Sequence, residues 1–134
     1  MKIYFSKEKP PIYEQCAKKF GVRWKDRIIF TYGNTIYCKN KVSQQKIAHE
    51  TTHIKQQQEY GIKEWWDRYF IDIDFRIKQE VEAYLNEISW IKENVRGMKN
   101  KEEKIEKVTK DLCSPIYGSV VTYEEAIKLL GLNK

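Results

Sequence analysis

The clearest periodicity in the chain runs from Phe75 to Arg96. Apolar and aromatic residues recur there at intervals of 4, 3, 4, 3 and 4 positions: Ile77, Val81, Tyr84, Ile88, Ile91 and Val95. At about 100° per residue these side chains fall within about 40° of one line along a helix. The pattern predicts a long amphipathic helix. We expect it to end at Gly97, because glycine readily adopts the backbone conformation that follows a helix.

Further segments carry helical patterns or helix-end signals, at residues 13–20, 43–60, 62–70, 100–112 and 123–130. Ser43 can cap the start of the second segment, and Gly21 and Gly61 follow the ends of the first two. Thr122 and Glu125 have the spacing of a capping box ahead of the last segment. Most of the chain is therefore predicted to be helical.

Two β-rich segments, residues 27–32 and 35–39, precede the 43–60 helix and are separated by Gly33-Asn34. This arrangement predicts a β-hairpin. Together with the helices it indicates the α+β class: one mainly helical domain over residues 1–134, with a short hairpin or small sheet before the 43–60 helix. An edge strand there suits an extended peptide, which adds to a sheet through backbone hydrogen bonds. Alternatively, the hairpin only covers the helix.

The composition of the chain limits which partners and which kinds of site are expected. The 134 residues carry a net charge of +6, which permits acidic partners such as nucleic acid, but a Lys-rich solvated surface explains it equally simply. Three widely spaced Cys residues argue against a disulfide framework and against a Cys-rich zinc site. No apolar run has the length of a signal peptide or membrane span, so no membrane partner and a cytoplasmic location are expected.

The candidate chemistry lies in the 43–60 segment, in His49-Glu50-Thr51-Thr52-His53. Residues four apart lie about 40° apart on a helix, so the imidazoles of His49 and His53 can bind one Zn²⁺ from the same side. Glu50 lies on the flank of that face, where a carboxylate can reach a water rather than the metal and act as a general base. The chain has two His residues in total, and both are in this motif.

A catalytic zinc ion needs a third protein ligand and an open position. Because no third His exists, a carboxylate on a later helix is expected. Relative to the apolar line of the 75–96 helix, Glu80 lies at about 60°, Glu87 at about 80° and Glu82 at about 140°. Glu80 is the predicted ligand, Glu87 a weaker candidate, and Glu82 a solvated side chain.

His49-Glu50-x-x-His53 followed by a Glu on a later helix resembles the gluzincin arrangement of metallopeptidases. More closely, the chain resembles small phage-encoded metallopeptidases of the zincin type. The similarity covers residues 34–37, the motif, Asp74-Phe75-Arg76 with Glu80–Tyr84, and 114–118 with Glu125-Ala126. One position differs: gluzincins often carry an Asp four residues after the ligand Glu, which orients a zinc-bound His. Here that residue is Tyr84, a poorer hydrogen-bond acceptor.

Two functions follow from these features. The first is a zinc metallopeptidase acting on a peptide or protein substrate, in which Zn²⁺ is held by His49, His53 and Glu80, and Glu50 is the general base. A further donor must stabilise the developing oxyanion; Tyr117, Tyr84 and Arg76 are possible, and Tyr117 is taken as the catalytic candidate. The alternative is a catalytically weak or inactive zincin-fold protein whose basic surface binds nucleic acid or a partner protein.

Overall fold

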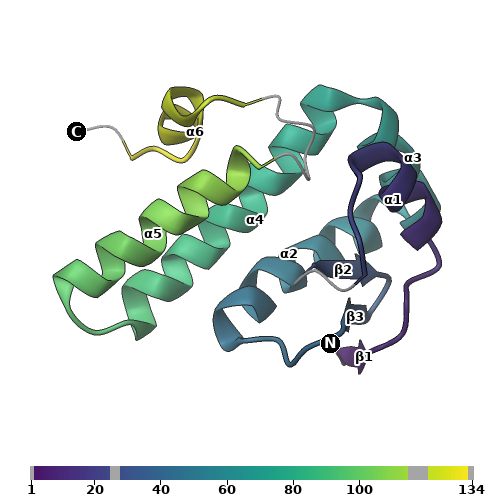
Figure 1. The fold of residues 1–134 in the computed structure, drawn as a ribbon, viewed down its shortest axis with the longest axis horizontal. Helices are drawn as coiled ribbons and strands as arrows, with labels where there is room; N and C mark the ends of the chain where they lie inside the picture. The colour runs from purple at the N-terminus through teal and green to yellow at the C-terminus, as the bar shows by residue number, and fades with distance from the viewer. Residues whose placement is uncertain (1, 25–27, 115–120, 133–134) are drawn as a thin grey trace.

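Two long helices, α2 (Gln44–Tyr60) and α4 (Ile73–Asn94), pack against each other at the centre of the fold (Figure 1). The computed structural model describes residues 2–24, 28–114 and 121–132. A small sheet lies beside α2, and α3 (Ile62–Ile71) connects α2 to α4. The other helices are α1 (Tyr13–Phe20), α5 (Met98–Leu112) and α6 (Tyr123–Leu129). The structure confirms the predicted α+β class.

The sheet has the strand order β1-β3-β2, from β1 (Tyr4–Ser6), β2 (Ile29–Tyr32) and β3 (Thr35–Cys38). Strands β2 and β3 form the predicted antiparallel hairpin, with Gly33 at a φ of 61°, a conformation that favours glycine. Strand β1 pairs with β3 in parallel and is not predicted by the sequence pattern, because three residues are too few to show a period. Within the described residues β2 pairs with β3 alone, so β2 is an edge strand that packs against α2.

The helix ends follow the expected capping chemistry. The Ser43 side chain accepts a hydrogen bond from the Lys46 backbone N–H at 3.2 Å, and both bonds of the Thr122–Glu125 capping box are present. The predicted end of α4 is wrong: α4 begins and ends two residues before the predicted 75–96, and Gly97 instead precedes the first turn of α5.

The hydrophobic core has two parts. One joins α1, α3 and the sheet through a cluster of aromatic side chains that includes Trp65, Trp66 and Tyr69. The other joins the apolar line of α4 to α5 and α6, with Ile88 and Ile91 at its centre. All three Cys residues are free thiols; Cys16 and Cys38 are buried, and Cys113 is partly exposed. None of the helices in the described part of the chain has the length and hydrophobicity needed to cross a bilayer.

The apolar line of α4 thus faces α5, and a different side of the same helix faces α2. That second side is buried but polar, and it includes Gln79, Glu80 and Glu87. The predicted position of Glu80, on the shoulder of the apolar line, therefore brings it to α2.

Candidate metal centre

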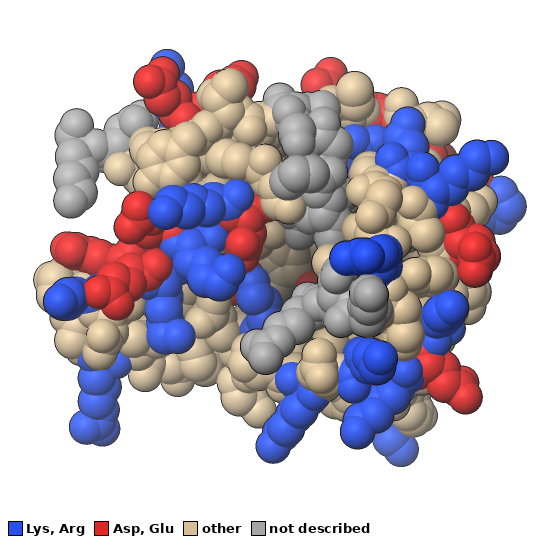
Figure 2. Space-filling model, viewed as in Figure 1, with Lys and Arg blue, Asp and Glu red and all other residues tan. Residues whose placement is uncertain are grey.

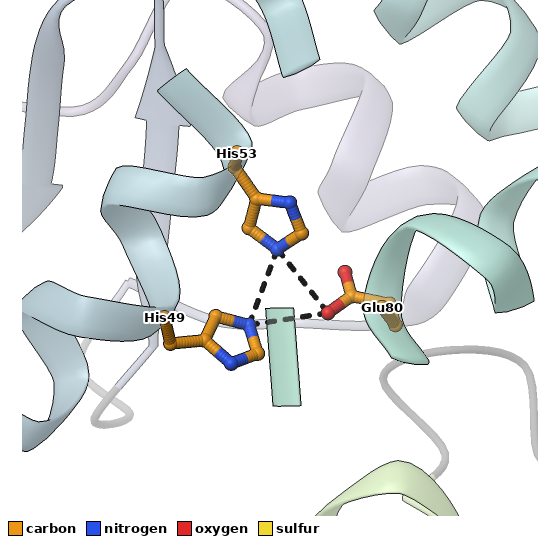
Figure 3. Close-up of side chains that lie close together, drawn as sticks. All are labelled: His49, His53 and Glu80. Atoms are coloured by element: carbon orange, nitrogen blue, oxygen red, sulfur yellow. Dashed lines mark hydrogen bonds and ion pairs between the residues drawn. The ribbon is translucent and has the colours of Figure 1, made fainter. Parts of the chain in front are cut away.

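His49 and His53 of α2 and Glu80 of α4 point toward one another (Figure 3). The two Nε2 atoms are 3.1 Å apart, and each lies 3.2 Å from Glu80 Oε1. All three side chains are buried. We call these residues the triad. Among the residues that the structure describes, they form the one group of His, Cys, Asp and Glu side chains with the geometry to hold a metal ion.

The spacing of the triad suits a small divalent ion. Ligand atoms at about 2.0–2.1 Å from one tetrahedral ion stand about 3.3–3.4 Å apart. The observed separations of 3.1 to 3.2 Å are close to that value. An ion could therefore enter with only small movements of the three side chains, and one tetrahedral corner would remain for another ligand.

His53 is held in the tautomer that a metal ligand needs. Its Nδ1 lies 2.8 Å from the Oε1 atom of Gln56, and the Gln56 amide donates to the Gln79 carbonyl and to Glu82. Because the amide group donates through nitrogen, its oxygen accepts, so His53 Nδ1 carries the proton. The lone pair on Nε2 is then directed at the other triad atoms.

His49 is oriented by a carboxylate. Its Nδ1 donates to Glu87 Oε1 at 3.1 Å, and Glu87 Oε2 accepts from Gln45 at 2.6 Å and from the Lys46 ammonium at 3.0 Å. Burial alone would raise the pKa of Glu87, but the hydrogen bond from His49 and the charge of Lys46 together lower it. Glu87 is fully buried and ionised.

Glu87 therefore plays the orienting role that the resemblance assigns to the position of Tyr84. The Tyr84 ring instead packs against the His49 imidazole, with ring centroids 4.4 Å apart. Glu87 was the weaker candidate for the third ligand, and the sequence also carries a signal for its place beside the triad. Seven residues make about two helical turns, so Glu80 and Glu87 share one side of α4.

A residue of α3 holds Glu80, the third member of the triad. The Tyr69 hydroxyl donates to Glu80 Oε2 at 2.6 Å, which leaves Glu80 Oε1 facing the two imidazoles. Tyr69 lies in the predicted 62–70 helix and packs in the aromatic core. Its contact with Glu80 could not be read from the sequence, because it depends on how α3 and α4 meet.

Glu50 lies beside the triad without belonging to it. Its Oε2 is 3.9 Å from His49 Nε2, and its Oε1 accepts a hydrogen bond from Thr31 of β2 at 2.7 Å. The side chain is buried. The sheet thus fixes one carboxylate oxygen and leaves the other near the triad. Glu82, in contrast, is exposed, as predicted, and its contact is with Gln56.

Two cavities adjoin the centre, and His49 and Glu50 line both. A groove of about 650 Å³ runs between the β2 side and α5, where the face shown in Figure 2 is hollowed near its middle. A smaller recess of about 50 Å³ is lined by all three triad residues and by residues of the aromatic cluster of the core. The centre therefore adjoins one space wide enough for a large ligand and one much smaller recess.

The expected oxyanion donors lie in different places. Tyr84 is among the groove residues. Arg76 lines neither cavity; its buried guanidinium donates to the carbonyl oxygens of Tyr69 and Phe70, where α3 joins α4. Tyr117 lies outside the described residues, so its role remains a prediction.

The charges at the centre are unbalanced without a cation. Glu50, Glu80 and Glu87 are buried carboxylates, and Lys46 is the partner of one of them. With neutral imidazoles two negative charges remain, a number that a divalent ion neutralises.

In the metal-free protein, protons on the imidazoles take the place of that ion. Burial disfavours the imidazolium of His49, but the hydrogen bonds to Glu80 and Glu87 raise the pKa to about 10. Burial also opposes the charged form of His53, yet the charge of Glu80 raises its pKa.

Neither a protein-family model, nor a curated protein, nor a solved structure matches the chain. The resemblance to zincins therefore rests on the motif, the triad and the helices that carry them.

Replacing Glu80 by Gln should weaken metal binding far more than replacing Glu82 by Gln. Both changes keep an oxygen acceptor, for Tyr69 and for Gln56 respectively, so folding is little disturbed. We expect a loss of affinity above 100-fold for Glu80→Gln and below threefold for Glu82→Gln, measured by zinc competition with a chromophoric chelator. A 100-fold loss corresponds to about 2.7 kcal/mol of metal-dependent stability. Equal affinities in the two variants would show that Glu80 is not a ligand.

Glu87→Gln should lower zinc affinity about 10–100-fold, the usual cost of losing an outer carboxylate partner of a metal-binding His. The physical reason is that a neutral amide orients the His49 ring less strongly and removes the ion pair between Lys46 and residue 87. Glu93→Gln, at an exposed position of the same helix, is the matched control and should bind zinc like the native protein. Native affinity in Glu87→Gln would contradict the orienting role.

Metal-dependent stability should increase with pH. Because the folded-state pKa values of His49 and His53 lie above the ordinary 6.5, protonation stabilises the metal-free fold fully below pH 6.5. That contribution is lost as the pH rises toward about 10. Zinc binds the deprotonated imidazoles, so its stabilisation grows over the same range.

The difference in Tm between zinc-loaded and chelator-treated protein should therefore widen from pH 6 to pH 9. The double variant His49→Asn, His53→Asn should show no such difference at any pH. A difference that shrinks with rising pH would contradict this assignment of the protons.

Proposed function

We propose that the protein is a zinc-dependent metallopeptidase. The observation that carries this proposal is the position of Glu50, a buried carboxylate beside the triad with one oxygen held by Thr31 and the other directed toward the centre. Two imidazoles and one carboxylate form the donor set of a catalytic zinc site, which keeps one position open. His49, His53 and Glu80 would hold the ion, and zinc when bound supplies Lewis acidity toward a water and a peptide carbonyl.

Glu50 is the general base in this proposal. Its Oε2 takes a proton from the attacking water and later delivers it to the nitrogen of the departing amine. The bond from Thr31 to Oε1 limits rotation of the carboxylate, so the same oxygen faces the reacting atoms in both steps. The edge strand β2 gives an extended substrate a backbone partner, since Ile29 of that strand lines the groove. Tyr84, another groove residue, is the described candidate for the oxyanion donor.

The alternative of a nucleic-acid-binding protein has less support. A single-strand binder needs exposed aromatic side chains in a basic channel. The groove contains one aromatic residue, Tyr84, among its described lining, and that ring is buried against His49. Over the α5 region of Figure 2, Lys and Arg side chains are intermixed with Asp and Glu.

Glu50→Gln should retain zinc and lose at least 100-fold of the rate of peptide hydrolysis, the usual range for a general base. Gln keeps the acceptor for Thr31, so the fold and the triad are preserved. Zinc content by elemental analysis and cleavage of a mixed peptide pool by mass spectrometry test this. Glu59→Gln, at an exposed position of α2, is the control. No cleavage by zinc-loaded native protein, or loss of zinc in Glu50→Gln, would refute the proposal.

A further inference from the structure

The recess beside the triad restricts what can lie next to the reacting bond. It has a volume of about 50 Å³, and its lining includes the triad and Glu50 at one end. Apart from Thr31, the other walls are apolar or aromatic and include Cys16, Val22, Phe30, Trp65 and Trp66. A ligand held at the triad therefore meets this recess directly.

The size of the recess decides which side chains fit. A cavity of about 150 Å³ holds benzene, which has six heavy atoms, so about 50 Å³ has room for about two. A bound metal ion and the attacking water would occupy part of this volume. What remains suits a hydrogen atom or a methyl group, the side chains of Gly and Ala. A Leu or Phe side chain would have to displace the walls.

The walls resist such displacement. Trp65 and Trp66 are almost fully buried, and their rings meet edge to face with centroids 4.9 Å apart. Trp65 also stacks on Tyr69 at 4.9 Å and donates its indole N–H to Gln79 at 2.8 Å. Forcing extra methylene groups into a packed core costs about 1–3 kcal/mol. A rigid wall of this kind discriminates by size, by about 10–200-fold for each methylene group.

From this geometry we propose that the protein acts on peptides that carry Gly or Ala at one of the two positions flanking the cleaved bond. The inference rests on the proposed function. The side chain at this position enters the recess, and the rest of the peptide extends along β2 and the groove. Val22 and Cys16 are the specificity-determining wall residues, since neither takes part in the aromatic stacking or in the triad.

The test combines a binding measurement with a cleavage measurement. Zinc-loaded protein is titrated with the hydroxamates of glycine, alanine, leucine and phenylalanine, which bind zinc without requiring turnover, and a peptide pool is digested in parallel. We expect the Gly and Ala hydroxamates to bind at least tenfold more tightly than the Leu and Phe compounds. We also expect Gly or Ala to be enriched at one flanking position of the cleaved peptides.

Enlarging the recess should relax this preference. Val22→Ala removes two carbons from the wall and should reduce the small-to-large affinity ratio at least threefold. Val121→Ala is the matched control, because Val121 has the same exposure of 7% but lies in the other core cluster. Cys16→Ala removes one sulfur atom from the same wall and replaces Val22→Ala as the test if that variant does not fold.

The outcomes separate this inference from the proposed function. Size-selective hydroxamate binding without cleavage of any peptide would refute the peptidase and retain the small-residue recess. Cleavage with no preference for Gly or Ala would support the peptidase and refute the small-residue recess. Equal binding of all four hydroxamates, binding of none, or the same change of ratio in Val22→Ala and Val121→Ala would overturn the inference.

Discussion

The fold depends on an interface between α2 and α4 that is buried and yet polar. His49, His53, Glu80 and Glu87 meet there, where helices normally bury apolar side chains. Buried ionised groups cost several kcal/mol each unless opposite charge and hydrogen bonds compensate them. Compensation at this interface comes from Lys46 and from either protons or a divalent cation. The stability of the protein therefore depends on whether protons or a divalent cation occupy the triad between these two helices.

Gln56 of the same helix holds His53, whereas the other side chains of the centre are held by partners from other elements. Tyr69 of α3 fixes Glu80, Thr31 of β2 fixes Glu50, and Glu87 of α4 fixes His49. These hydrogen bonds select tautomers and rotamers, so that three ligand atoms converge before any ion is bound. The small sheet and the short α3 helix thus contribute to the chemistry although neither carries a triad residue.

The sequence predicted those features that depend on local spacing. The pairing of His49 with His53 follows from one helical turn, and the position of Glu80 follows from the apolar line of α4. Tyr69 and Thr31 were missed as site residues, and Glu87 was considered only as a third ligand, because their contacts join separate elements and a spacing rule does not show how elements pack. Strand β1 was missed for a related reason: its pairing partner β3 lies about thirty residues further along the chain.

The apolar side of α4 explains how a polar interface is tolerated on its other side. Tyr84, Ile88 and Ile91 are buried against α5 and α6, and burying each such side chain contributes about 1.5–3 kcal/mol. This packing holds α4 in place independently of the triad, so the position of Glu80 does not rely on the metal. Helix α5 packs against the apolar side of α4, α6 packs against α5, and together they stabilise the backbone that presents the triad. Rigid support of this kind keeps three ligands within the small distances that catalytic geometry requires.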